Sequence, residues 1–447
     1  MMIKDFRRLR PVVSRWFSLR HWRSQLAFWC GGLLVGLVAV AVAKLADGAQ
    51  LIFDAGLKLA WWMPLIVTPA GFAISAYVAR RWFPGSQGSG IPQVIAAAEI
   101  VRHHPRALDR LVSLRILIGK SALLLFGLLT GASIGREGPT VQIGAIIMRL
   151  TGRMGRIAGN ESALLLAGGA AGVAAAFNTP LAGIVFAIEE LGRSFEQRTS
   201  GTVILAVMLA GVASLGLLGD YTYFGHSTAV LMPIPDLYAV IVCGIGGGLL
   251  GGAYSRGLIY GLKHMGKAFG GWIGRRPVVF AAICGLLLAI LGVVAGHDIF
   301  GTGYGRARLL LQGVESPFHE FGVLKLAATL LSTVSGVPGG IFAPSLATGA
   351  GIGAELHWLL PVAPLATMAL LGMVGYFSGV VQSPLTAFVI VMEMTNSHGM
   401  VIPLIATSVL AYSVSRLVCA RPLYHSLSQS FVKQERDSRI EAKAEAV

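Results

Sequence analysis

An arginine and a glutamate stand where this chain should lie inside a membrane. The segment Gly135-Arg136-Glu137-Gly138-Pro139 separates one apolar run, residues 116–132, from another, residues 141–147. A charge at that depth is costly unless it is paired, hydrated or used, so the carboxylate indicates a functional site. Gly135 and Gly138 permit a bend and a close approach, and Pro139 suits the first turn of a helix. We therefore predict a helix that begins in mid-membrane, with an anion site at its positive end that Glu137 itself can fill.

The whole chain has the composition of a polytopic membrane protein. It is 55% hydrophobic and 13% charged over 447 residues, more apolar surface than a soluble protein of this length can bury. The net charge of +15 is consistent with basic loops facing anionic lipid, and we predict no nucleic-acid partner. The four cysteines lie in or beside apolar runs without ligand spacing, so we predict neither disulfides nor a metal site.

The distribution of charges predicts the topology and the domain boundaries. Residues 1–24 form a basic segment with one acidic residue, which places the N-terminus in the cytoplasm. The run Gln25–Leu45 should cross outward, Asp47 and Asp54 should mark an outer loop, and residues 61–78 should cross back. We predict a first membrane repeat at 25–218, an external linker at 219–236, a second repeat at 237–432 and a cytoplasmic tail at 433–447.

The segment from Gly85 to Ile100 has basic residues on both flanks and is too short to cross. Its helical part, Ile91–Ile100, has ten residues, whereas a span needs about 20. The segment should therefore enter the membrane and return, with Gly88, Ser89 and Gly90 at its tip and Pro92 opening the short helix. Its inward-pointing N-terminus, with the Ser89 hydroxyl, predicts a second anion site.

An internal repeat shows at a nearly constant shift. Lys120, Gly135, Pro139, Gly144 and Ala145 recur 205 positions on, as Lys325, Gly340, Pro344, Gly349 and Ala350. Pro180, Leu181 and Glu189 recur 204 positions on, as Pro384, Leu385 and Glu393. Paired interrupted helices in two halves are typical of a transporter whose substrate site lies at the repeat interface. The matches alone do not say whether the repeat is inverted.

These motifs together resemble one known family, the CLC chloride channels and chloride/proton antiporters. The resemblance is carried by four features, in order: Gly88-Ser89-Gly90-Ile91-Pro92, Gly135-Arg136-Glu137-Gly138-Pro139, Gly340-Ile341-Phe342-Ala343-Pro344 and a late Tyr424. It implies an all-α polytopic membrane protein, built as an inverted repeat of tilted and re-entrant helices. It also implies a homodimer in the lipid bilayer with one pathway per subunit, here without the CBS domains of many eukaryotic members.

The resemblance also implies roles for individual residues. The hydroxyl groups of Ser89 and Tyr424 would bind chloride together with the backbone N–H groups of Ile341 and Phe342. Glu137 would be the gating carboxylate, and Glu190 would match the inner proton-transfer glutamate of the antiporters. The supporting residues would be Gly88, Gly90, Pro92, Gly135, Arg136, Gly138 and Lys120. The chain departs from well-known bacterial members at Gln93 and Ile95, where those carry carboxylates.

The residues leave an alternative open beside most of these roles. Glu137 and Arg136 can form a structural ion pair, and the Ser89 hydroxyl can cap its own helix. Tyr424 can be an interfacial aromatic residue, and Glu189 can carry the proton in place of Glu190. Lys120 can raise the local potential or pair with a buried carboxylate, and we interpret Glu393 as structural.

The function that we predict is exchange of chloride for protons across a plasma membrane, with both termini in the cytoplasm. A passive chloride channel of the same fold is the alternative, and Glu190 argues against it because a leak needs no inner proton carrier. A fluoride-selective relative is disfavoured by Ser89. We predict no enzyme, cofactor or metal: there is no paired-Asp site or nucleophile elbow, and His103-His104 lacks ligand spacing.

Overall fold

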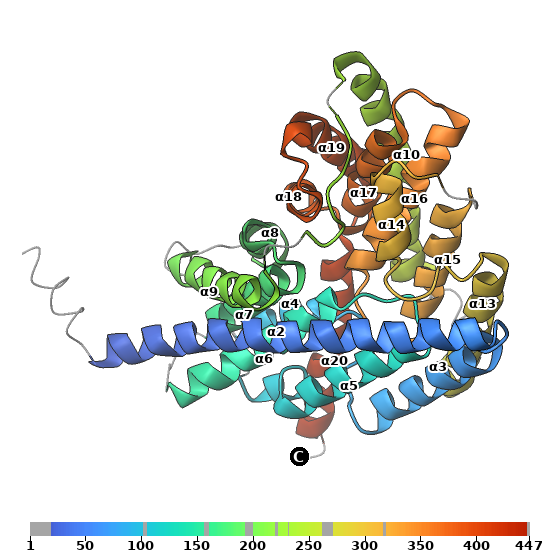
Figure 1. The fold of residues 1–447 in the computed structure, drawn as a ribbon. Helices are drawn as coiled ribbons and strands as arrows, with labels where there is room; N and C mark the ends of the chain where they lie inside the picture. Colours follow the sequence, from blue (N-terminus) through green and yellow to red (C-terminus); the bar gives the residue numbers. More distant parts are fainter. Residues whose placement is uncertain are drawn as a thin grey trace, which may run out of the picture.

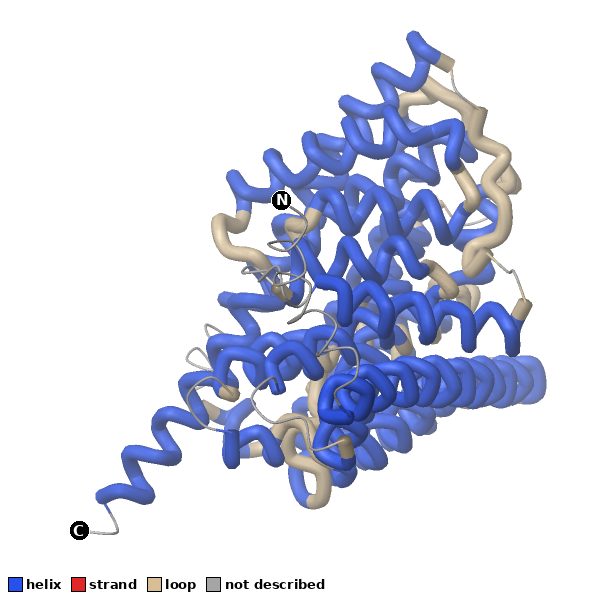
Figure 2. The backbone as a smooth tube through the Cα atoms, turned by 90° about the vertical axis from the view of Figure 1, so that its left-hand side faces the viewer, coloured by secondary structure: helices blue, strands red, loops and turns tan. Residues whose placement is uncertain are grey.

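The computed structural model describes residues 19–101, 105–155, 161–192, 200–219, 222–230, 232–261, 271–315 and 319–444. Most of the basic N-terminal segment, the His103-His104 pair and parts of the 219–236 linker lie outside these ranges. In the part that is described, the regular elements are helices (Figure 2). The first half contains α2 (Leu19–Leu59), α3 (Pro64–Arg81), α4 (Ile91–Ile100), η1 (Pro105–Arg110), α5 (Leu114–Leu129), α6 (Glu137–Met154), α7 (Glu161–Phe177), α8 (Pro180–Phe186), η2 (Ala187–Leu191) and α9 (Ser200–Leu218). The second contains α10 (Pro233–Arg256), η3 (Gly257–Gly261), α12 (Trp272–Arg275), α13 (Pro277–Val294), α14 (Tyr304–Leu311), α15 (Phe321–Val334), α16 (Phe342–Leu359), α17 (Leu365–Val381), α18 (Pro384–Thr395), η4 (His398–Met400), α19 (Val401–Val418) and α20 (Leu423–Ala444).

The two halves of the sequence form two groups of helices in space. The first half, blue to green in Figure 1, lies along the long helix α2, and most of the second half, yellow to red, stands beside it. Helix α20 leaves the second half and reaches the first, where it packs against α4. An ion pair between Arg110 and Glu435 (3.3 Å) also joins α20 to η1, and α20 runs through the expected tail boundary at 432 without a break.

Apolar helices of two lengths make up this fold. Among the described residues, five helical stretches are long and apolar enough to cross a membrane: 25–59, 108–129, 237–261, 277–294 and 398–418. Six shorter apolar helices, of 10–17 residues, accompany them. Helix α4 has the predicted limits, Ile91 and Ile100, and all but one of its residues are buried. The expectation of a polytopic protein with interrupted helices is confirmed.

The prediction of an outer loop at Asp47 and Asp54 was wrong. Both residues lie within α2, which continues for 41 residues from Leu19 to Leu59. Each carboxylate has a hydrogen-bond donor where it lies on the helix. Asp47 accepts a hydrogen bond from Arg136 at 2.8 Å, and Asp54 accepts one from Gln50 at 3.1 Å. Because Arg136 is 89 positions away in the sequence, nothing near Asp47 indicated this partner.

Matching glycines hold the central helix pairs of the two halves together. A Cβ on Gly144 of α6 would lie 2.2 Å from the carbonyl oxygen of Gly168 in α7. The second half repeats this contact between α16 and α17, where a Cβ on Gly349 would lie 2.6 Å from the carbonyl oxygen of Gly372. Small residues allow such backbone approach, which is how helices associate where water does not drive packing. The repeat in the sequence therefore corresponds to a repeated helix–helix contact in the structure.

The two halves also cap each other reciprocally. Glu189 of the first half accepts hydrogen bonds from the backbone N–H groups of Leu385 (3.1 Å) and Thr386 (2.6 Å) at the start of α18. Glu393 of the second half accepts them from Leu181 (3.3 Å) and Ala182 (2.7 Å) at the start of α8. Each carboxylate meets free N–H groups at a positive helix end. Reciprocal contacts of this kind are those of a two-fold relation, as expected for an inverted repeat.

Candidate functional site

Three helix N-termini converge where the halves meet. Helices α6 and α16 begin at Glu137 and Phe342, and α4 begins at Ile91. Gly135 and Gly340, which lie two residues before α6 and α16, exchange backbone hydrogen bonds of 2.7 and 2.6 Å. The first N–H groups of each helix have no partner within the helix, and its dipole is positive at that end. The predicted mid-membrane helix starts are thus present and adjoin one another.

Glycine is required where these segments touch. A Cβ on Gly138 would lie 2.3 Å from the Ser89 hydroxyl oxygen and 3.0 Å from the Cα atom of Gly340. Gly90 has φ +110°, and a Cβ there would lie 2.6 Å from the carbonyl oxygen of Gly138. Gly138 and Gly90 therefore let the tip of the Gly85–Ile100 segment reach the start of α6. This brings Ser89 beside Glu137, although 48 positions separate them in the sequence.

Polar groups from three segments are buried together at this point. Glu137 and Tyr424 are fully buried, and Ser89 is 8% exposed. Neither carboxylate oxygen of Glu137, nor the hydroxyl of Ser89 or Tyr424, forms a hydrogen bond of normal geometry with the described residues. Tyr424 lies close enough to interact with both Ser89 and Glu137. Buried groups of this kind need a partner, and here the three lie close to one another.

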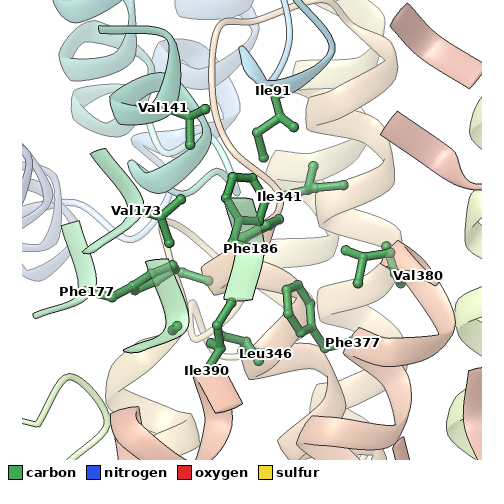
Figure 3. Packing of buried hydrophobic residues seen from close by; sticks show 14 of the residues in the cluster. Ile91, Val141, Val173, Phe177, Phe186, Ile341, Leu346, Phe377, Val380 and Ile390 are labelled. Carbon is green, nitrogen blue, oxygen red and sulfur yellow. The ribbon is translucent and has the colours of Figure 1, made fainter. Parts of the chain in front are cut away.

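Aromatic rings from both halves form the apolar wall beside these polar groups. The Phe342 ring lies 5.8 Å from that of Tyr424, 5.8 Å from Phe186 and 4.9 Å from Phe377. Figure 3 shows Phe186 and Phe377 of this wall, with Ile91 and Ile341 in the same buried cluster. Ile341 is the residue preceding α16 and is buried. Ile341 and Phe342 therefore contribute buried side chains to the wall and helix-start N–H groups to the polar side.

The Arg136 side chain reaches away from the centre to α2. It donates to the carbonyl oxygen of Ala43 at 2.9 Å and pairs with Asp47 at 2.8 Å. Its guanidinium group also stacks on the ring of Tyr223, 5.2 Å from the centroid. Arg136 thus fixes the start of α6 against α2 and, as the residue next to Glu137, contributes positive charge to it.

Tyr223 is a residue of this site that the sequence did not indicate. It is 8% exposed, and the Glu137 carboxylate interacts with its hydroxyl group and with the backbone N–H of Ala343. Its segment is held in place by backbone hydrogen bonds, such as that from Phe224 N–H to the carbonyl oxygen of Met394 at 3.1 Å. The only signal in the sequence was an aromatic residue in the expected linker. That signal says nothing about a contact 86 positions away.

Cavities approach the site from two directions. One of about 360 Å³ is lined by Arg136, Tyr223, His226, Tyr304 and Arg308, and it adjoins a larger one of about 740 Å³ along α2. Another, of about 620 Å³, is lined by Gly85 and Gln87 of the Ser89 segment, by Arg80 and Arg115, and by α20. These cavities are large enough to hold several water molecules, and each has arginine in its wall.

Lys120 holds the loop that presents Ser89. Its ammonium group donates to the carbonyl oxygens of Ser86 (2.8 Å) and Gly88 (2.5 Å), so its partner is not a carboxylate. Its repeat mate Lys325 does the same for Ile299 (2.8 Å) and Gly301 (2.7 Å). Gln93 adds a hydrogen bond to the Gln87 carbonyl oxygen at 2.5 Å, which gives this amide a structural use.

Lys120→Met should destabilise the fold and disorder the Ser89 loop, because two buried carbonyl oxygens lose their donor. We expect a loss of about 1–3 kcal/mol in the free energy of unfolding, together with weaker anion binding. Thermal unfolding in detergent and chloride calorimetry would measure both. Lys325→Met is the matched control: it should lose similar stability but keep chloride affinity. Equal losses of affinity in both variants would contradict a specific role for Lys120.

Glu190 lies on a different element, the π-helical turn η2. Its carboxylate accepts a hydrogen bond from the Ser383 hydroxyl group and lies within electrostatic reach of Tyr424. Its neighbour Glu189 is engaged with the start of α18, as described above. The predicted residues therefore fall into a central group, with Ser89, Glu137, Ile341, Phe342 and Tyr424, and a separate position at Glu190.

Comparisons with known proteins agree with this arrangement. Residues 70–416 match the family described as "Voltage gated chloride channel". A slow cyanobacterial Cl⁻/H⁺ antiporter has a similar structure, with TM-score 0.78 and 24% identity over 93% of this chain and 99% of that one. A CLC-type fluoride/proton antiporter has TM-score 0.74 and 24% identity over 91% of this chain and 98% of that one. A eukaryotic CLC transporter has TM-score 0.75 and 20% identity over 92% of this chain and 75% of that one.

At these identities the three structures establish the fold, and the family match covers most of the chain. The family consists of channels and transporters and not of enzymes, which agrees with the expectation from the sequence. Its members are multi-pass membrane proteins. The chain is thus an all-helical membrane protein of the CLC family of chloride channels and transporters.

Proposed function

We propose that this protein exchanges chloride for protons, with Glu137 and chloride competing for one site. The observation that carries the proposal is the burial of the Glu137 carboxylate at converging helix N-termini, beside the hydroxyl groups of Ser89 and Tyr424. Partial positive charges can replace the water around chloride without trapping it as a full charge does. The ionised carboxylate occupies the same positive region, and protonation removes its charge and lets it leave.

The Glu190 position favours exchange over a passive leak. An exchanger needs a second titratable group to carry protons between Glu137 and the opposite side, and a chloride leak needs none. Glu190 is a carboxylate at a separate position, within electrostatic reach of Tyr424. Its repeat mate, 204 positions on, is Met394, so the repeat itself does not require an acid there. A passive channel of the same fold is the second candidate.

The test is the reversal potential of the purified protein in chloride-loaded vesicles at several pH gradients. An exchanger should show a reversal potential that moves with the pH gradient at fixed chloride. A value set by chloride alone would overturn the proposal in favour of a channel. Repeating the measurement with fluoride would separate a chloride exchanger from a fluoride-selective one, since one structural relative is a fluoride/proton antiporter.

We further propose a homodimer in a plasma membrane, with both termini on the cytoplasmic side. Exposed apolar side chains on α9 and α19, among them Met208, Val212 and Ile402, provide a surface that lipid or a second copy can cover. The basic residues near the N-terminus support the orientation.

Ser89→Ala should weaken chloride binding, because the buried hydroxyl is one of the donors that face the site. We expect an affinity loss of about tenfold, the effect of one hydrogen bond to an ion. Calorimetric titration with chloride would measure it. Ser86→Ala is the control: Ser86 is a buried serine of the same loop, outside the central group. Unchanged affinity in Ser89→Ala would remove this hydroxyl from the site.

A further inference from the structure

The N-termini of α8 and α18 are repeat mates with nearly identical backbones. Thr179 precedes α8 with φ −129° and ψ 82°, and Ser383 precedes α18 with φ −129° and ψ 83°. Both stand where Ser and Thr normally cap the helix with their own hydroxyl group, yet neither does so. The reason is that Glu393 and Glu189 from the opposite half already accept hydrogen bonds from the first N–H groups of these helices. Neither hydroxyl group is therefore needed to cap its own helix.

These hydroxyl groups then differ between the two halves. The Thr179 hydroxyl is buried and has no hydrogen-bond partner among the described residues. The Ser383 hydroxyl, on a residue that is 3% exposed, donates to the Glu190 carboxylate. Thr179 has no such partner because the residue that matches Glu190 in the second half is Met394. The contact between Ser383 and Glu190 is thus a departure from the symmetry of the fold.

The backbone departs from symmetry at the same place. Residues 187–191 form a π-helical turn, whereas their mates 391–395 remain in the α-helix α18. A π turn contains an additional residue, and such turns are frequent at functional sites. The turn allows two consecutive carboxylates to serve different partners: Glu189 caps α18, and Glu190 reaches Ser383.

We propose that Ser383 is a positioning residue for the proton carrier Glu190. Its hydroxyl group holds the ionised carboxylate in one orientation and stabilises that form until a proton arrives. The proton then binds a carboxylate oxygen of Glu190, and the hydroxyl remains as a weaker partner of the neutral acid. This inference rests on the proposed function, in which Glu190 carries protons.

The described residues around Glu190 include other ionisable groups. On its own turn there is Glu189, and on α20 there is Tyr424. Among the described residues of the helices that pack against the turn, α7 has Glu161 at its start, and α18 has Glu393 near its end. Replacing Ser383 therefore changes the surroundings of the Glu190 carboxylate without adding or removing a charge.

The experiment measures protonation of Glu190 by infrared difference spectroscopy of the full chain in lipid, with Glu190→Gln to assign the carboxyl band. In Ser383→Ala, the pH at which half of this band has formed should rise by about one unit, a tenfold change, because the ionised form loses a donor. Ser383→Thr should restore the original profile. Ser383→Gly, which also suits the position before a helix, provides a second variant without the hydroxyl.

Thr179→Ala is the matched control, since it removes the equivalent hydroxyl group in the half that lacks the acid. It should leave the Glu190 band and its pH profile unchanged. An unchanged profile in Ser383→Ala and Ser383→Gly, or an equal shift in Thr179→Ala, would overturn the proposal. The band reports the protonation of Glu190 directly, so this result is independent of the transport test. If the unmodified protein did not exchange chloride for protons, its reversal potential would not change with the pH gradient.

Discussion

Glu137→Ala should abolish proton movement while chloride continues to cross. The carboxylate is fully buried at the meeting point of α6 and α16, and in the proposed mechanism it is the group that takes up a proton when chloride displaces it. With a methyl group in its place, chloride meets the helix N-termini without a competitor. In chloride-loaded vesicles, proton uptake should fall to background, and the reversal potential should follow chloride alone.

The matched control for this variant is Glu355→Gln. Glu355 is a partly buried carboxylate at the far end of α16 that accepts a hydrogen bond from Val323 N–H at 3.1 Å. Its loss should reduce stability but leave coupling intact. Proton uptake that persists in Glu137→Ala would remove this glutamate from the mechanism.

Glu190→Gln should uncouple the protein, with at least a tenfold fall in proton flux and continued chloride flux. Glutamine preserves the shape of the side chain and can still accept the Ser383 hydrogen bond through its amide oxygen. It cannot take up a proton at physiological pH, so protons should no longer pass between Glu137 and the opposite side of the membrane. Parallel recordings of proton and chloride flux would give the coupling ratio.

Glu189→Gln separates the two neighbouring carboxylates. Because Glu189 caps α18, its neutral replacement should lower the free energy of unfolding by about 0.5–2 kcal/mol without changing the coupling ratio. Loss of coupling in this variant, with normal coupling in Glu190→Gln, would assign the proton to Glu189. The structure already engages Glu189 with backbone groups, which is the physical basis for expecting the opposite.

The sequence predicted those features that depend on local chemistry. Glycine and proline around Glu137 located the start of α6, the short apolar run located α4, and the repeat of Lys120 at Lys325 marked equivalent loops. These predictions succeeded because backbone freedom, helix starts and buried charges depend on a few adjacent residues.

Features that depend on distant partners could not be predicted. Asp47 suggested a loop because its partner Arg136 comes much later in the chain, and Tyr223 stood in an expected linker although it lies over that same arginine. The reciprocal caps of Glu189 and Glu393 required both halves to be placed in space. The repeat indicated that the glutamates were equivalent, but not that each serves the other half.

The backbone bridge between Gly135 and Gly340 has a consequence for how the protein can move. Many transporters open to one side and then the other by rocking one bundle as a rigid body. Here such tilting would pull apart two short hydrogen bonds at the centre, and the bond from Gly339 N–H to the Gly88 carbonyl oxygen (3.2 Å) with them, in every cycle. The scaffold at the ion site should therefore stay locked, so that a cycle is completed by rotation of individual side chains.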